Sequence, residues 1–402
     1  MDKIDEKIFN LLYQDPFRSI NEISKVLGVS FTLVNSRINK MKQNGLLYKN
    51  KEIIDPIFGK RTTSHITASV NSNALGLIKH HIIFYNLPNI ETIQILDKFF
   101  DVHPYTTYKA TVIGQGMSMY AQFDFHPSIM EDMIELYELI CQELNIPDYL
   151  MIKGTDLINI QPNLSYQHLE DENINVEDNF NKISNKIMSF YWKKYLKDKE
   201  MGNIIKKVIK IKPVPKVKIS ELQLKLIREI TINGNAPLKE LSKYYKRDVS
   251  TISRYLNGIK EKYIRNGKLK FHPSNARFNC FKFITGEFSF RNGITKNDFK
   301  EFISYQEFPF FGFIVFENNY YLMYVATNTK DFQEIYEFIW NNSVSNTIQV
   351  FELYTENASE YFFYHLNFIN GKFNTDKKYF FDDPLKELEI MIKTTIMSEV
   401  VS

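Results

Sequence analysis

The chain has 402 residues, which is too long for one typical hydrophobic core, and its 44% hydrophobic and 24% charged residues are typical of a soluble globular protein. It has no apolar run of about 18 residues, and its charged start lacks the apolar core of a secretion signal, so we expect a cytoplasmic protein without a membrane span. Two distant cysteines exclude a disulfide framework or a Cys-based metal site.

The small net charge of +3 conceals an uneven distribution along the chain. Residues 1–60 carry +3, residues 193–215 carry +6 and residues 216–277 carry +10, whereas residues 61–192 and 278–402 carry −9 and −7. Two basic segments separated by an acidic one are the electrostatic pattern of a chain that contacts nucleic acid at two places.

Residues 3–47 have the pattern of three short helices. Asp15-Pro16 ends the first helix, because proline disfavours helical geometry in the residue before it. Ser19 and Glu22 form a capping box at the start of the second, and Gly28 supplies a left-handed turn before the third. Gly45 ends the third helix, and the strand that begins at Leu46 completes the layout of a winged helix-turn-helix.

The next segment predicts strands and helices in βαββαβ order, with a hairpin through the Gly114-Gln115-Gly116 turn. The strands are expected at 78–87, 105–113, 117–125 and 149–160, and the helices at 89–101 and 128–144. Residues 161–218 predict a helix over 179–198 and then an extended basic tether.

The second half repeats the first at an offset of 218 residues, because residues 23–47 align without a gap with residues 241–265. Lys246-Arg247-Asp248 replaces the glycine turn, and Pro237 starts the second helix of this unit. Asn266-Gly267 predicts a two-residue hairpin, and hence a short basic wing.

A second βαββαβ segment follows, with Asn318-Asn319 at its central hairpin, and one helix is expected in the tail. The strands are expected at 280–290, 310–317, 320–327 and 347–355, and the helices at 296–307, 330–341 and 383–398.

The predicted fold class is therefore α+β, with two winged helix-turn-helix domains each followed by a ferredoxin-like βαββαβ domain. The winged domains are expected at 1–60 and 219–275, the ferredoxin-like domains at 61–165 and 276–365, the helical and basic linker at 166–218, and the tail with its helix at 366–402.

These patterns resemble the leucine-responsive/asparagine-regulator (Lrp/AsnC) family of prokaryotic transcriptional regulators. Ile4-Asp5 opens the first helix, ISKVLGVS stands at 23–30, and Arg37 and Gly45-Leu46 follow at the family's spacing. The resemblance implies a regulator that binds double-stranded DNA. Family members usually carry one such unit and dimerise, so this tandem chain would form an internal pseudo-dimer or a homodimer.

The third helix of each unit carries the predicted DNA contacts. Small polar and basic side chains on its outer face suit base edges in the major groove, while lysines near the wing suit phosphates. These residues are Ser30, Thr32, Asn35, Ser36, Arg37, Asn39, Lys40, Lys49 and Lys51 in the first unit, and Ser250, Thr251, Ser253, Arg254, Asn257, Lys260, Lys268 and Lys270 in the second.

The resemblance also implies an amino-acid effector near the turn that contains Gly114 and Gly116. The simpler interpretation, which we prefer, is that these glycines only form the hairpin. The second copy has no glycine there.

Two other functions remain open. Because the linker is rich in lysine, the chain could be an architectural chromosome-binding protein with little sequence preference. Some proteins of this architecture are sirohaem decarboxylases, which makes an enzyme a third hypothesis. His80 and His81 are adjacent in a strand and would point to opposite faces, whereas His103 and His126 precede prolines. With no nucleophile–base pair, metal motif or cofactor motif in the sequence, we expect a protein that is not an enzyme.

Overall fold

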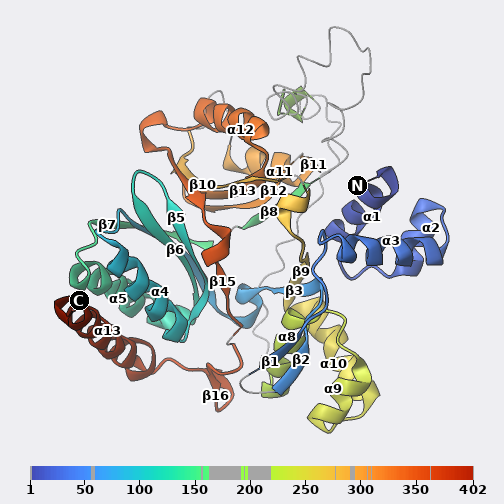
Figure 1. Cartoon of the computed structure of the whole chain (residues 1–402), viewed down its shortest axis with the longest axis horizontal. Coiled ribbons are helices and arrows are strands. Elements are labelled where there is room, and N and C mark those ends of the chain that lie inside the picture. The colour runs from blue at the N-terminus through green and yellow to red at the C-terminus, as the bar shows by residue number, and fades with distance from the viewer. Residues whose placement is uncertain are drawn as a thin grey trace.

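The computed structural model describes residues 2–55, 59–154, 157–162, 192–193, 195–197, 219–276, 278–289, 295–305, 307–308, 310–362 and 364–401. Figure 1 shows two sheet-and-helix domains, with the two three-helix units beside them on one side of the molecule. Among the described helices, none is long and apolar enough to cross a membrane.

The three helices of the first unit form as its sequence predicts, whereas the strand expected from Leu46 is reduced to one isolated bridge between Leu47 and Phe271. The Ser19 and Glu22 capping box is present, and Gly28 adopts a left-handed φ of +66° between the second and third helices. The Asp2 side chain caps the first helix by accepting from the backbone N–H groups of Ile4 and Asp5. Its helices are α1 (Lys3–Gln14), α2 (Ile20–Leu27) and α3 (Phe31–Gln43).

The second unit has the same three helices but a different turn. Lys246 takes the place of Gly28 and adopts φ +50°, a left-handed conformation that costs a residue with a side chain about 1–2 kcal/mol. Ser220 and Gln223 form a capping box at the start of the unit. Its helices are α8 (Glu221–Ile232), α9 (Leu238–Tyr245) and α10 (Val249–Lys262).

The two units differ in their wings. In the first, β1 (Glu52–Asp55) and β2 (Gly59–Thr62) pair as an antiparallel hairpin. In the second, the hairpin predicted at Asn266-Gly267 is wrong. Strand β9 (Ile264–Leu269) runs straight through this dipeptide and pairs with β3 (Ile66–Val70) of the first half.

Packing explains why a glycine stands at this position without forming a turn. A Cβ on Gly267 would lie 2.9–3.1 Å from the ring atoms of Pro16, in the turn between α1 and α2. The glycine therefore allows the first unit to approach β9 closely. Local sequence indicates a turn because it carries no information on this distant partner.

Both predicted ferredoxin-like domains are present. Their strand orders are β7-β4-β6-β5 and β14-β10-β13-β12, so each fourth strand lies beside the first, and all these pairs are antiparallel. The first consists of β4 (Ile78–Tyr85), α4 (Ile90–Val102), β5 (Thr106–Ile113), β6 (Met117–Phe125), α5 (Met130–Glu143) and β7 (Asp148–Lys153). The second consists of β10 (Cys280–Glu287), α11 (Lys296–Tyr305), β12 (Phe311–Glu317), β13 (Tyr320–Thr327), α12 (Thr329–Asn342) and β14 (Gln349–Leu353).

The halves exchange strands at the ends of these domains. The strand predicted over 149–160 is in fact two strands, because after β7 the chain crosses to the other domain as β8 (Ile158–Pro162) and pairs with β12. In return, β15 (Ser359–Glu360) follows β14 and pairs with β5 of the first domain. The short β11 (Glu307–Phe308) pairs with β8, and β14 itself pairs with β5, so that one continuous sheet spans both domains.

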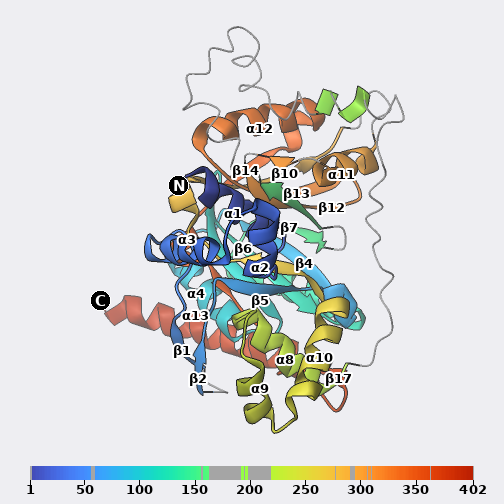
Figure 2. The same cartoon turned by 90° about the vertical axis from the view of Figure 1, so that its right-hand side faces the viewer.

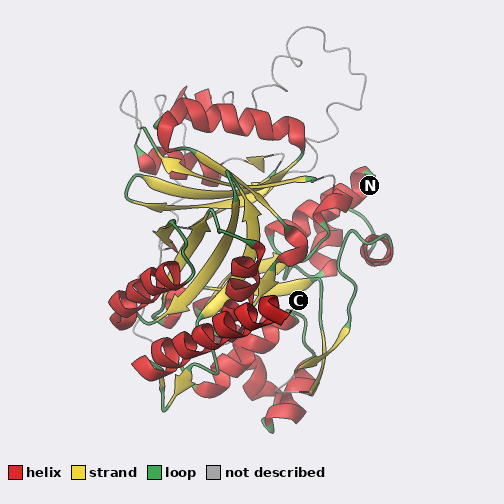
Figure 3. Ribbon diagram, turned by 60° about the vertical axis from the view of Figure 1, so that its left-hand side comes forward, coloured by secondary structure: helices red, strands yellow, loops and turns green. Residues whose placement is uncertain are grey.

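The two halves of this continuous sheet, one from each domain, pack on each other through the faces that carry no helices. Alternating residues such as Ile83 and Tyr120 of the first sheet meet Phe283, Leu322 and Phe351 of the second in one apolar cluster. The helices lie on the outer faces, as Figure 3 shows. The result is one sheet whose two halves pack face to face between two helical layers.

Segments that follow each domain also cover the opposite half. Helix α13 (Asp383–Val401), predicted at 383–398, packs against α4 and contributes Leu388 to the first domain's core (Figure 2). It follows the short hairpin of β16 (Phe368–Ile369) and β17 (Lys372–Phe373). In the linker, Trp192 and Tyr195 pack into the core of the second domain. Most of the helix predicted over 179–198 and the basic tether lie outside the described residues.

The core of each winged unit contains residues from the other half. Phe271 and Phe278 belong to the core of the first unit and Phe311 packs against it, and the rings of Phe9 and Phe271 meet edge to face at 5.1 Å. Ala74, Leu75 and Leu77 of the first half belong to the core of the second unit. The two halves therefore form one interlocked structure.

Candidate nucleic-acid interface

Helix α3 presents a polar face to solvent. Val34, Ile38 and Met41 are buried against the rest of the first unit. Of the predicted contacts, Asn35 is half-buried. The exposed ones are Ser30, Thr32, Ser36, Asn39 and Lys40, and Lys49 and Lys51 after the helix are also exposed.

Arg37, the arginine expected on this face, is engaged inside the unit. Its guanidinium is half-buried, forms an ion pair with Asp2 and lies 3.4 Å from the Asp5 carboxylate. Backbone hydrogen bonding at Asp5 and the Arg37 guanidinium lower the pKa of Asp2 below its usual value. Arg37 therefore links α3 to α1, and a base contact would require it to leave these carboxylates.

Helix α10 offers a second polar face. Ile252, Leu256 and Ile259 are buried, Ser250, Arg254 and Asn257 are exposed, and Thr251 and Ser253 are half-buried. Lys246 and Arg247, in the turn before the helix, are also exposed. The sequence pattern does not indicate these two residues as contacts, because they stand where the first unit has its turn glycine.

Lys260 connects the two units. Its Nζ lies 4.4 Å from the centre of the Phe17 ring, which belongs to the turn between α1 and α2, and burial lowers the pKa of Lys260. A Cβ on Gly234 would lie 2.9 Å from the same ring, so Phe17 is inserted between α10 and the turn after α8. These contacts fix the position of one three-helix unit relative to the other.

Lys268 and Lys270, predicted on a wing, lie on and just after β9. Lys268 Nζ is 2.9 Å and Lys270 Nζ 4.0 Å from the Glu360 carboxylate on the strand that crosses from the second domain. Burial raises the pKa of Glu360, but the two lysines outweigh this effect and the net pKa is lowered. Both lysines therefore stabilise the junction between the halves.

The two candidate effector glycines lie at the hairpin turn, as expected. A Cβ on Gly114 would lie 2.7 Å from the ring of Phe351 in the second domain, and one on Gly116 would lie 3.0 Å from the Asn86 side chain. The Gly114 backbone N–H donates to the Gly116 carbonyl. Gly114 thus allows the domains to pack closely.

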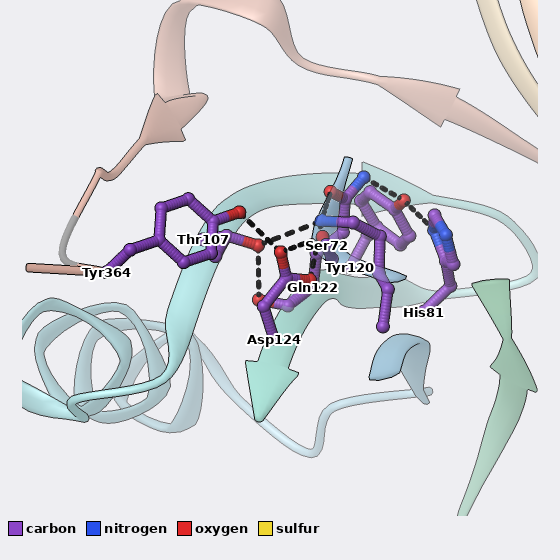
Figure 4. A network of polar contacts seen from close by, with 8 residues as sticks. Ser72, His81, Thr107, Tyr120, Gln122, Asp124 and Tyr364 are labelled. Carbon is purple, nitrogen blue, oxygen red and sulfur yellow. Dashed lines mark hydrogen bonds and ion pairs between the residues drawn. The ribbon is translucent and has the colours of Figure 1, made fainter. Parts of the chain in front are cut away.

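A buried polar network lies where the first domain meets the tail (Figure 4). The fully buried Asp124 carboxylate accepts hydrogen bonds from Ser72 and from Tyr364 of the tail, and Lys79 Nζ lies 2.7 Å from its other oxygen. From Lys79 the contacts continue through Thr107 and Gln122 to Tyr120 and His81, and the Tyr120 hydroxyl is 2.7 Å from His81 Nδ1. This network stabilises the junction between β4, β6 and the tail.

The four histidines weighed as catalytic candidates do not share a site. His80 packs against Phe125 on the helical side of the sheet, whereas His81 faces Phe313 between the sheets. His103 ends α4 with its Nε2 3.1 Å from the carbonyl oxygen of Phe380, and His126 caps the turn before α5. In the described part of the chain, no group of three or more His, Cys, Asp or Glu side chains could hold a metal ion.

Comparison with known proteins supports the interpretation of the first unit as a winged helix-turn-helix. Residues 1–48 match the family model described as winged helix-turn-helix DNA-binding. The HTH-type transcriptional regulator FL11 of Pyrococcus horikoshii is 38% identical over 56 residues, which are 14% of this chain and 37% of that protein. An HTH-type transcriptional regulator of Pyrococcus furiosus is 27% identical over 111 residues, covering 27% of this chain and 74% of the relative. The chain thus spans little more than a third of FL11.

Two solved structures match this chain at low sequence identity. The siroheme decarboxylase NirDL has a TM-score of 0.48 at 11% identity, covering 96% of this chain and 100% of NirDL. An AsnC family transcriptional regulator from Agrobacterium tumefaciens has a TM-score of 0.27 at 16% identity, covering 39% of this chain and 91% of its own. At these values neither carries an argument about activity.

One winged helix-turn-helix unit and a second three-helix unit of the same layout, on paired ferredoxin-like domains, define the class of this protein. Its first unit, residues 1–48, is a winged helix-turn-helix of the DNA-binding type. The relatives among transcriptional regulators agree with this match, and membership of the Lrp/AsnC family stays a prediction from the sequence.

Proposed function

We propose that the chain is a transcriptional regulator that binds one duplex DNA segment with both three-helix units. The observation that carries this proposal is the rigid pairing of two exposed polar helices, α3 and α10, through β3, β9 and Phe17. Because the spacing of the two helices is fixed before binding, little conformational entropy is lost when both enter the major groove.

The charge distribution supports the same partner. The segments that contain the two units carry +3 and +10, whereas both ferredoxin-like segments are acidic. Exposed Lys40, Lys246, Arg247 and Arg254 stand on or beside the two polar helices, where they would neutralise phosphates.

Base contacts are assigned to the exposed polar residues of α3 and α10. Asn39 and Asn257, which occupy equivalent positions in the two units, are exposed and have the side-chain amide that pairs with adenine. Arg37, Lys260, Lys268 and Lys270 are assigned to fixing the protein's own geometry instead.

The alternatives predict different binding behaviour. An architectural protein would bind every duplex with similar affinity, since phosphate contacts carry no base information. We propose that the chain is not an enzyme, because its four candidate histidines lie in different environments. An amino-acid effector at Gly114 and Gly116 remains a prediction. In the structure both glycines have packing roles.

The test is a DNA-binding titration of the full chain with a duplex selected from a random-sequence pool, repeated at several salt concentrations. Asn39→Ala and Asn257→Ala should each weaken binding to the selected duplex by about 10-fold, corresponding to ~1–3 kcal/mol per base contact. Arg254→Ala should also reduce the steepness of the salt dependence by about one contact. Lys393→Ala, which removes one exposed charge from α13, is the matched control and should change neither.

Absence of sequence preference in the selected pool would favour the architectural protein. Unchanged affinity in all three variants on a duplex that the wild type selects would contradict the assignment of α3 and α10 as reading helices.

A further inference from the structure

One large apolar side chain stands exposed at the first position of each reading helix. Phe31 begins α3 and is 48% exposed, and Val249 begins α10 and is 42% exposed. The two positions are related by the same offset of 218 residues that relates the two units. Neither side chain belongs to the apolar core of its unit.

The core of each unit does not fully cover the apolar residue at this position. Phe31 precedes the buried Val34 by three residues in α3, and Val249 precedes the buried Ile252 by three residues in α10, so each lies at the N-terminal end of the apolar stripe of its helix. About half of each side chain remains in water, and this half gains nothing from burial within the protein. The recurrence of this exposure in both units points to a partner that covers it.

The surroundings limit what that partner can be. Exposed hydrogen-bonding residues flank each side chain, Ser30 and Thr32 in α3 and Ser250 in α10. A single apolar side chain among polar ones is too small for a stable protein interface, which needs roughly 800 Å² on each partner. A base-pair edge has the matching chemistry, since thymine presents one 5-methyl group among hydrogen-bonding atoms in the major groove.

We infer that Phe31 and Val249 select thymine, by packing against the 5-methyl group of one thymine in each half of the DNA site. This inference rests on the proposed function and adds to it the base read at the start of each helix. The phenylalanine side chain is longer than the valine side chain, so the two thymines lie at different distances from their helices. The two half-sites are therefore not identical.

The experiment uses the full chain and its selected duplex, with each thymine replaced in turn by uracil. Uracil keeps every hydrogen-bonding atom of thymine and lacks only the methyl group, so any lost affinity reports a contact with that methyl. For the wild type, one position in each half-site should lose about fourfold in Kd, as expected for one buried methyl-sized group at ~0.8 kcal/mol.

Each alanine variant should remove the preference in one half-site only. Phe31→Ala should bind the thymine and uracil forms of its half-site equally while keeping the preference in the other half, and Val249→Ala should do the converse. Ile390→Ala, which removes a 54% exposed side chain from α13, is the control and should keep both preferences. All three side chains are exposed, so the thermal midpoint of each variant should equal that of the wild type.

The outcomes separate this inference from the proposed function. If the wild type binds its selected duplex but uracil is tolerated everywhere, or if Phe31→Ala and Val249→Ala keep their preferences, the thymine assignment is wrong and the regulator remains. If the two variants change only the molecular mass in solution, the side chains contact a second copy of the chain. If no duplex is bound, both conclusions fail.

Discussion

Replacing Asp124 with alanine should cost the fold about 3 kcal/mol. The substitution removes the only carboxylate in the network of Figure 4 and leaves the Lys79 ammonium, whose side chain is 18% exposed, without its ion-pair partner at 2.7 Å. Breaking one side of a buried ion pair costs ~3–5 kcal/mol. We take the lower end because Lys79 retains Thr107 and Gln122 as hydrogen-bond acceptors at 3.3 and 3.4 Å.

Thermal unfolding followed by near-ultraviolet circular dichroism measures this loss, and a drop in Tm of roughly 3–4 °C is expected for a chain of this size. Lys79→Met should cost a similar amount, because it leaves the Asp124 carboxylate buried beside Ser72 and Tyr364 alone. The double variant leaves no uncompensated charge, so its cost should fall below the sum of the single costs by at least ~1 kcal/mol. Strict additivity would refute the assignment of this ion pair as the centre of the junction.

Two further perturbations test the packing and the buried histidines. Gly312→Ala should abolish folding, because its Cβ would lie 1.9 Å from the Tyr324 carbonyl oxygen. Gly258→Ala, whose Cβ would have nothing within 4 Å, should raise the stability of the helix by ~0.5–1 kcal/mol. Soluble yield and Tm of the two variants test this pair, and a well-folded Gly312→Ala protein would be incompatible with the β12–β13 contact. Burial lowers the pKa of His80 from 6.5 to about 4, so the folded state resists protonation that the unfolded state accepts. Stability is therefore fully present above pH 6.5 and declines as the pH falls toward 4, by up to ~1.4 kcal/mol per pH unit for this group. His80→Phe should flatten that decline in a pH series of Tm values, and an unchanged slope would show that His80 does not cause it.

Local signals predicted most of the elements. The Asp15-Pro16 stop, the Ser19 and Glu22 capping box and the left-handed Gly28 each depend on residues within one turn of the chain, and all three are present. Asn318 likewise adopts the positive φ expected of a tight hairpin. Such signals can be recognised in the sequence because the residues that cause a helix to begin, end or turn lie next to that point in the chain.

The predictions that were wrong concern segments whose structure depends on residues far away in the sequence. Asn266-Gly267 does not turn because β3 and Pro16, more than 190 residues earlier in the chain, meet this segment. The expected last strand of the first domain divides because β12 of the other half receives its second part. Neither partner can be read from the pattern of the segment itself.

In the candidate interface, too, local features were predicted correctly and contacts between distant residues were not. The periodicity of α3 and α10 correctly separated inward from outward positions, including exposed Asn39 and Asn257. It could not show that Asp2 and Asp5 engage Arg37, or that Glu360 engages Lys268 and Lys270. Helical periodicity predicts only the direction in which a side chain leaves its helix. The charged groups that the side chain then contacts depend on the tertiary structure.

The exchange of strands and helices between the halves has a consequence for how the protein can vary. In a symmetric homodimer, one substitution appears at both equivalent positions and must suit both. Here the two copies share one chain, so Gly28 and Lys246, or Phe31 and Val249, differ without affecting one another. The interlocked cores keep the copies together while their outer surfaces vary independently, a freedom that two identical subunits do not have.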